Sequence, residues 1–232
     1  MANGLYFVIE GIEGAGKTTA TAMVAARLQV LLPERKVIAT RHPGATPLGM
    51  HLRTLIKYPW KIDPAIEVDA LSGQFLMVVD NSCFVSTVLN PALEEGSIVL
   101  ADRSNFISSI AYGVADGLEY AQIDRMFQVA QPPKADRLYV LRLPWEIARE
   151  RMMAQGGGDK GGLDRFEQKG ERFFLKVQEI YNGLVTGPQE LLMVVNHSVR
   201  LENILYIDAT QHVQAVVNEI VRDVYRQVIE SA

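Results

Sequence analysis

Short apolar runs alternate along the chain with longer segments in which apolar residues recur at the spacing of a helix. This alternation is typical of a parallel sheet whose crossover helices cover both faces. The pattern therefore predicts an α/β fold with three layers, α/β/α, around a five-stranded parallel sheet. The expected strands, all rich in Val, Ile or Leu, are Leu5–Glu10, Lys36–Thr40, Ser97–Ala101, Arg137–Leu143 and Asn203–Ile207.

The longer segments supply the expected helices, with Ser108 and Thr210 as candidate N-caps. Between two of these helices lies a glycine-rich run, 156–162. We expect one domain over 1–232, in which this run belongs to a lid at about 151–166 that closes over a substrate, although an ordinary surface loop would have the same composition. The expected helices are Lys17–Leu32, Pro47–Lys57, Ala70–Leu93, Leu118–Ala130, Trp145–Gln155, Arg165–Leu184 and Thr210–Ile229.

A phosphate-binding loop follows the first expected strand and leads into the first expected helix. It runs through Gly11, Ile12, Glu13, Gly14, Ala15, Gly16, Lys17 and Thr18. Its glycines let main-chain N–H groups turn toward a polyphosphate, while the helix directs its positive end to the same place. Lys17 can reach the outer phosphates and Thr18 can bind Mg²⁺. The loop therefore predicts a P-loop NTPase fold that binds a nucleoside triphosphate.

A second candidate site comes directly after the third expected strand, at Asp102 and Arg103. Ligands of parallel sheets gather at the carboxyl ends of the strands, so both side chains are expected beside the phosphate loop. A carboxylate there can hold the Mg²⁺ shell, and an arginine can donate two hydrogen bonds to a phosphate.

Composition narrows the classes of partner. The net charge of −4 disfavours a broad nucleic-acid or anionic-lipid surface, and we expect neither a nucleic-acid nor a membrane partner. The single cysteine, Cys83, rules out an intrachain disulfide and a multi-cysteine zinc site. No apolar stretch reaches the roughly 20 residues needed to span a bilayer, so a soluble cytoplasmic protein is expected.

Five segments in order resemble thymidylate kinases, and the resemblance covers about residues 5 to 225. They are the phosphate loop with Thr19, Thr40–Gly49, Pro91–Arg103, Leu163–Gln168 and Ile207–Gln211. The resemblance implies an enzyme that transfers the γ-phosphoryl group of ATP, with Mg²⁺, to a deoxynucleoside monophosphate, giving ADP and a diphosphate. It also implies a homodimer through a helical face. The segment 70–93 is apolar enough to contribute to that face, or to form a second buried core face instead.

The resemblance also implies roles for individual residues. Gly11, Glu13, Gly14, Ala15, Gly16, Lys17, Thr18 and Thr19 would hold ATP, with Thr18 and Asp102 near the metal. Glu13 matches an acidic position near the acceptor sugar, and Arg103 matches the arginine that clamps the acceptor phosphate. Arg41, Pro43 and Arg53 fall where the family surrounds the monophosphate, although surface salt bridges would explain both arginines. Tyr112 matches an aromatic residue on the acceptor sugar, or is simply a buried helix residue.

Arginines near the lid are further catalytic candidates, since an inserted arginine stabilises the transferring phosphoryl group. Arg151 and Arg165 match basic family positions. Met153 and Gln155, however, stand where bacterial relatives with this kind of loop have arginines. Lys160 is a candidate replacement, and slower catalysis is the alternative.

The expected nucleobase pocket departs from the family. Met77, Asn81 and Cys83 replace a phenylalanine, an arginine and a glutamine, and Ser109 aligns near the base edge. Losing an aromatic ring removes about 1–3 kcal/mol of base stacking. Two interpretations remain open: the acceptor is a 5-modified deoxyuridylate or one of several deoxynucleotides, or the enzyme is a divergent form that still prefers thymidylate.

Proteins of other classes share parts of this pattern. A regulatory GTPase would share the phosphate loop, and residues 159–162 have the spacing of its switch segment, but no guanine-reading motif follows. A nucleic-acid kinase or an ATP-dependent nucleic-acid-binding protein would need a basic stripe, which the acidic composition disfavours. A protein that binds nucleotide without turnover is the third alternative.

Overall fold

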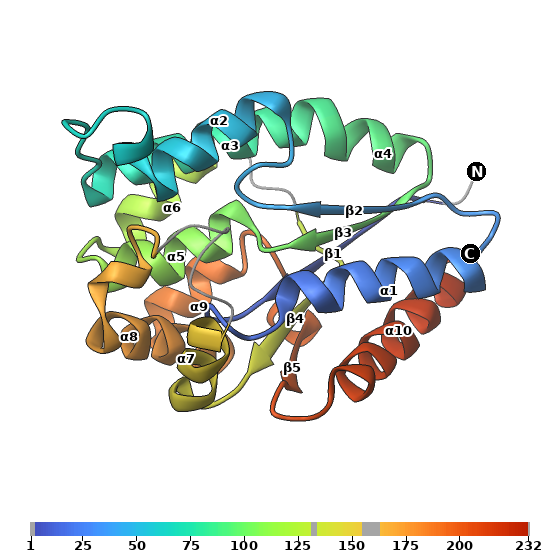
Figure 1. Ribbon diagram of the computed structural model, residues 1–232. Coiled ribbons are helices and arrows are strands. Elements are labelled where there is room, and N and C mark those ends of the chain that lie inside the picture. Colours follow the sequence, from blue (N-terminus) through green and yellow to red (C-terminus); the bar gives the residue numbers. More distant parts are fainter. Residues whose placement is uncertain (1–2, 131–133, 155–162, 232) are drawn as a thin grey trace.

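The computed structural model describes residues 3–130, 134–154 and 163–231. Its centre is a five-stranded parallel sheet with strand order β2-β3-β1-β4-β5, which confirms the predicted fold class (Figure 1). The strands are β1 (Leu5–Glu10), β2 (Val37–Arg41), β3 (Ile98–Asp102), β4 (Arg137–Arg142) and β5 (Ile204–Asp208). Each lies within two residues of its predicted position.

The two faces of the sheet follow from the alternation of side chains along β1. Neighbouring residues in a strand point to opposite faces. Tyr6 packs against the ring of Phe84, whereas Phe7 stacks on Tyr139, whose hydroxyl bonds Asp223. One layer therefore holds α1 (Lys17–Leu31) packed against α10 (Val213–Glu230), and α3 (Ala70–Phe84) lies on the opposite face (Figure 1).

Several of the remaining helices pack on α3 or on its neighbour α5. The helices α2 (Pro47–Lys57) and α5 (Asn105–Ala115) pack on α3, as does α6 (Tyr120–Ala130), while α8 (Glu171–Asn182) packs on α5. The others are α4 (Asn90–Glu94), α7 (Trp145–Ala154) and α9 (Gln189–Val195), with 3₁₀ turns at Pro59–Lys61, Glu167–Lys169 and Leu201–Asn203. The π-helical turn Val85–Leu89 joins α3 to α4.

The structure corrects the predicted helices in several places. Helix α5 was missed, and all of its residues 105–113 are buried. The short helix α9 was missed within the segment expected to be irregular. The predicted helix 165–184 begins only at Glu171, because Gly170 has a φ of 79°.

Both predicted N-caps were wrong. Ser104, not Ser108, caps α5 by accepting from the Ile107 N–H, and His212, not Thr210, caps α10 by accepting from the Gln214 N–H. Ser108 lies inside α5, where its hydroxyl has another partner, and the chain at Thr210 is still in a turn.

One continuous helical stretch, Ala70–Glu94, is long and apolar enough to cross a membrane by length and composition. It also carries the buried polar residues Gln74, Asp80 and Asn81 on the side that packs into the protein. Gln74 and Met77 of this stretch line the cavity described below.

Candidate active site

One cavity opens at the carboxyl ends of β1, β2 and β3, where the parallel strands place their following residues together. The pairing aligns Ile9 and Arg41 with Asp102, so the phosphate loop, the segment after β2 and Arg103 meet at one edge. The predicted residues that line this cavity are Glu13, Gly14, Gly16, Lys17, Thr18, Thr19, Arg41, Pro43, Arg53, Met77, Asp102, Arg103, Ser109, Tyr112 and Arg165. Four other predicted residues, Gly11, Ala15, Asn81 and Arg151, lie outside the lining.

The phosphate loop is shaped for an anion by its backbone. Gly14 has a φ of 78°, and a Cβ atom there would lie 2.3 Å from the Ala148 carbonyl oxygen, so only glycine fits against α7. The Lys17 ammonium is buried and donates to the Ile12 carbonyl oxygen at 2.7 Å. Burial, together with the charge of Arg103, lowers the pKa of Lys17 to about 8. The loop thus holds a desolvated cation that an incoming polyphosphate would favour.

A hydroxyl and a carboxylate lie together beside this lysine. The Thr18 hydroxyl donates to Asp102 Oδ2 at 2.5 Å, and the Asp102 Oδ1 atom is buried without a partner among the described residues. Mg²⁺ is commonly held by one or two such oxygen ligands together with substrate phosphates and water. The pair therefore fits the magnesium site expected from the sequence.

Arg103 occupies a backbone conformation that is uncommon for a residue with a side chain. Its φ is 77°, and its N–H bonds the Ile9 carbonyl oxygen at 2.9 Å. This turn directs the guanidinium to the phosphate loop, where it donates to Gly11 O at 3.3 Å, to Glu13 Oε2 and to the Tyr112 hydroxyl at 3.1 Å. The expected neighbour relation between Arg103 and the loop is present.

A fully buried carboxylate, Glu10, supports this turn from below. Its Oε1 atom accepts from the Ser104 N–H at 2.8 Å and from the Ser108 hydroxyl at 2.9 Å. Its Oε2 atom accepts from the Tyr181 hydroxyl at 2.8 Å and lies 3.6 Å from Arg103 Nη1. Glu10 therefore joins the end of β1 to the residues on either side of the Arg103 side chain.

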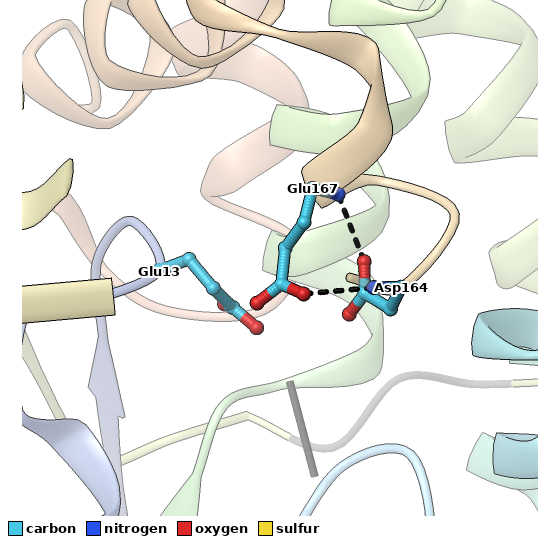
Figure 2. A group of neighbouring side chains, drawn as sticks. All are labelled: Glu13, Asp164 and Glu167. Carbon is cyan, nitrogen blue, oxygen red and sulfur yellow. Dashed lines mark hydrogen bonds between the residues drawn. The ribbon is translucent and has the colours of Figure 1, made fainter. Parts of the chain in front are cut away.

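Three carboxylates lie close together beside the phosphate loop: Glu13, Asp164 and Glu167 (Figure 2). Asp164 and Glu167 form a capping box, each accepting a hydrogen bond from the other's N–H, at 2.9 and 2.8 Å (Figure 2). Lys57 Nζ lies 2.7 Å from Asp164 Oδ2 and 3.4 Å from Glu13 Oε1. These contacts to Lys57 and Arg103 offset the negative charge and join the phosphate loop to the segment 163–169.

The charges around Glu13 and Lys57 stabilise each other's ionised forms. Burial alone would raise the pKa of Glu13, but Arg103 and Lys57 outweigh it and hold that pKa well below its usual range. Burial alone would lower the pKa of Lys57, but Glu13 and Asp164 outweigh it and raise that pKa. Both residues are therefore charged near neutral pH.

The other predicted arginines have different surroundings. Arg53 donates to the Pro43 carbonyl oxygen at 3.0 Å, and Arg41 ends β2 on the cavity wall. Arg165 packs over the Phe166 ring and donates to the Val68 carbonyl oxygen, while Arg151 donates to the Ala209 carbonyl oxygen at 3.0 Å. Arg165 thus lies on the cavity beside α3, and Arg151 reaches the loop after β5.

The α3–α5 wall, formed by Gln74, Met77, Ser108 and Ser109, closes another side of the cavity. Asn81 follows Met77 by one turn of α3 and is buried behind this wall. Tyr112 continues it along α5, with its ring 5.3 Å from Phe166 and 5.9 Å from Phe173. The predicted positions 77, 81, 109 and 112 are therefore neighbours on two packed helices.

Several predicted features of the lid lie outside the described residues. The structure does not describe residues 155–162. These residues include Gln155, the glycine run 156–162, Lys160 and the switch-like segment 159–162. Met153, which is described, is exposed at the end of α7.

Sequence reasoning missed Glu10, Lys57 and Gln74. Glu10 ends an otherwise apolar strand directly before the phosphate loop, and a charge in that position was an available signal. Lys57 ends α2 and looks like an ordinary surface lysine. Gln74 lies three residues before Met77 on the same face of α3, in a predominantly apolar segment, and no recognised motif includes it.

Comparisons with known proteins agree with this geometry. A family model described as thymidylate kinase matches residues 9–220. A thymidylate kinase of Exiguobacterium sibiricum is 33% identical over 224 residues, covering 95% of this chain and 94% of its own. One from Pseudomonas fluorescens is 34% identical over 82% of this chain and 87% of its own, and one from Caldicellulosiruptor saccharolyticus is 35% identical over 78% and 81%.

Proposed function

The chain belongs to the thymidylate kinase family, and we propose that it transfers the γ-phosphoryl group of ATP to dTMP, giving ADP and dTDP. The chain is thus a nucleoside monophosphate kinase, a transferase of nucleotide biosynthesis. The observation that carries the proposal is that a single cavity is lined by both Lys17 of the phosphate loop and Arg103 after β3. One cavity can therefore hold two phosphorylated molecules against each other.

The donor half of the cavity consists of the phosphate loop, Lys17 and the pair Thr18 and Asp102. Main-chain N–H groups and Lys17 would neutralise the β- and γ-phosphates of ATP. Thr18 and Asp102 would hold Mg²⁺, whose charge draws electron density from the phosphates. Arg151, which contacts the loop after β5, would lie on the donor side as well.

The acceptor half is built around Arg103. Its guanidinium would bind the phosphate of dTMP, with Arg41 and Arg53 adding positive charge and Tyr112 packing on the sugar. Glu13 and Arg165 would shape the same half from the loop and from the segment after the lid. An oxygen of the dTMP phosphate attacks the γ-phosphorus while the bond to the β–γ bridging oxygen breaks, and ADP leaves. Because this transition state is loose, positioning and charge neutralisation supply most of the catalysis.

The proposal extends to the assembly and its location. Leu71, Phe75 and Val79 form an apolar stripe at i, i+4 and i+8 on α3 and are 45%, 53% and 46% exposed. We propose a homodimer that acts in the cytoplasm; a two-fold contact between two copies of α3 would bury this self-complementary stripe, which supports the dimer. Sedimentation should show a dimer, and Phe75→Glu should shift it to monomer; a monomeric parent protein would contradict this part.

The catalytic proposal is tested by ADP release with ATP and Mg²⁺. We expect ADP to form only when dTMP is present, with one dTDP for each ADP. Single-stranded DNA in place of dTMP should give no ADP. ADP that depends on DNA, or tight ATP binding without turnover in the presence of dTMP, would contradict the proposal.

A further inference from the structure

Lys57 is a buried lysine on the wall of the active-site cavity. Among the described lysines only Lys17 and Lys57 are buried, and the Lys57 side chain is 10% exposed. Lys17 belongs to the phosphate loop, whereas Lys57 is the last residue of α2 and lines another side of the cavity. Because burying an ammonium group is costly unless other groups compensate its charge, the contacts of Lys57 indicate its role.

Lys57 joins three segments that are far apart in the sequence. Its Nζ atom lies 2.7 Å from Asp164 Oδ2 and 3.4 Å from Glu13 Oε1. Its carbonyl oxygen accepts a hydrogen bond from the Arg165 N–H at 2.9 Å. The end of α2 is therefore fixed to the segment 163–169 through both its main chain and its side chain, and it reaches the phosphate loop through the ammonium group.

Glu13 divides its carboxylate between two cations. Its Oε1 atom faces Lys57, while its Oε2 atom accepts from Arg103 Nη2 and lies 3.5 Å from the Tyr112 hydroxyl. Burial would raise the pKa of Glu13, but Arg103 and Lys57 together hold it well below its usual range. In this arrangement Arg103 is engaged by a carboxylate, so an acceptor phosphate must compete with Glu13 for the guanidinium.

We propose that Lys57 is a positioning residue that keeps Glu13 paired when Arg103 turns to the acceptor phosphate. The inference rests on the proposed function, in which Arg103 binds the phosphate of dTMP. With Lys57 in place, Glu13 can give up Arg103 and still keep a cation beside its Oε1 atom. Without Lys57, the same exchange would leave a buried carboxylate unpaired near a second anion, which costs free energy by desolvation and by repulsion.

The contact with Asp164 holds the Lys57 ammonium group in place for this role. Asp164 is 1% exposed and is bonded to Glu167 within the capping box, so its carboxylate is fixed (Figure 2). A lysine side chain has several rotatable bonds, and the contact with a fixed carboxylate limits where its ammonium group can lie. Lys57 therefore offers Glu13 a cation whose position does not depend on Arg103.

The test measures the Kd of dTMP and the Kd of MgATP by titration calorimetry in the parent protein, Lys57→Gln and Lys57→Arg. Glutamine removes the charge but keeps an N–H donor for Asp164, whereas arginine keeps the charge. We expect Lys57→Gln to weaken dTMP binding about 10- to 100-fold and MgATP binding less than about threefold, a range typical of coupling between groups in one protein. Lys57→Arg should keep most of the dTMP affinity. Lys61→Gln is the matched control, because Lys61 is exposed four residues later, and it should bind both nucleotides like the parent.

Two further variants separate this role from a purely structural one. Asp164→Asn leaves Lys57 its charge and an oxygen acceptor, so the Kd of dTMP should stay near the parent value even if the Tm falls. A structural tether alone predicts instead that Asp164→Asn weakens dTMP binding as Lys57→Gln does. The double variant of Lys57→Gln with Glu13→Gln lacks the carboxylate that needs a cation, so its dTMP affinity should match that of Glu13→Gln alone.

The inference is overturned if Lys57→Gln weakens dTMP and MgATP binding equally, or if Asp164→Asn weakens dTMP binding as much as Lys57→Gln does. Should Lys57→Gln not fold by itself, the double variant decides, and a weaker affinity for dTMP in it than in Glu13→Gln overturns the inference. A parent protein that does not bind dTMP would instead refute the proposed function itself.

Discussion

The phosphate end of the cavity and the α3–α5 wall are built on opposite principles. At the phosphate end, which comprises the phosphate loop, Asp102 and Arg103, nearly every charged group is held by a partner. Arg103 contacts Glu13, Tyr112 and the loop backbone, and Glu10 fixes the turn beneath it. Along the wall, by contrast, Gln74 Oε1 and the Ser109 hydroxyl are buried without partners in the part of the chain that the structure describes. The comparison suggests that rigid charge placement serves the chemistry, whereas unpaired neutral groups serve selection of the base.

The largest effect is expected from Lys17→Met. The substitution removes the cation that faces the triphosphate but leaves a side chain of similar length. We expect kcat/KM for dTMP to fall about 10²- to 10³-fold, comparable to losing one preorganised charge-stabilising donor. The dTMP-to-dCMP ratio should stay constant. Steady-state kinetics would measure both quantities, with Lys176→Met at an exposed position as the control. A changed dTMP-to-dCMP ratio in Lys17→Met would contradict the assignment of different roles to the two regions.

Glu10→Gln should have the next largest effect. An amide NH₂ would face donors that Glu10 now satisfies, so the free energy of unfolding should fall by about 1–3 kcal/mol. We expect kcat to fall about 10- to 100-fold because Arg103 loses its support, without a change in base preference.

Glu95→Gln is the matched control for this change, because Glu95 pairs with Lys36 at an exposed position. Surface pairs contribute about 0–1 kcal/mol, so its stability and kinetics should remain near those of the parent. Normal kcat in Glu10→Gln would show that Arg103 is positioned without Glu10.

The smallest effect is a pH dependence at the phosphate end. Burial, followed by the charge of Arg103, lowers the pKa of Lys17 to about 8 in the free protein, so its ammonium is lost above that pH. ATP favours the protonated form, and its affinity should be level below pH 7 and weaken above pH 8, by at most about tenfold per pH unit. Titration calorimetry should show this slope disappear in Lys17→Met.

The lowered pKa of Lys17 also affects the stability of the nucleotide-free protein, which should rise with pH whereas the affinity for ATP falls. The folded protein releases this proton at a lower pH than the unfolded chain, so between pH 8 and about 10.4 the unfolded chain binds more protons. The contribution of Lys17 to the stability of the nucleotide-free protein should therefore rise with pH across this window. A Tm difference between the parent and Lys17→Met that does not change with pH would contradict the assigned burial.

The phosphate end could be predicted from the sequence, because the residues that form it are local in the chain or follow directly from strand order. The loop is one contiguous motif, and Asp102 and Arg103 come at the end of a buried strand. The contacts of Glu10 and Lys57 could not be assigned in this way. Their partners, such as Tyr181 and Asp164, are more than a hundred residues away, and no local pattern specifies such contacts.

The α3–α5 wall was only partly predictable. The resemblance pointed to Met77, Asn81 and Ser109, but Gln74 departs from no recognised pattern and became visible only through its burial and its position over Gly113. Helix α5, which carries Ser109 and Tyr112, was itself missed, although its apolar residues recur at helical spacing.

A double-mutant cycle between Arg103→Lys and Gln74→Met tests the division between chemistry and base selection most directly. The measured quantity is the dTMP-to-dCMP ratio of kcat/KM in the parent, the two single variants and the double variant. We predict that Arg103→Lys lowers both rates and leaves the ratio intact, that Gln74→Met lowers the ratio, and that the double variant shows the Gln74→Met ratio. A ratio that falls as far in Arg103→Lys as in Gln74→Met would contradict the account.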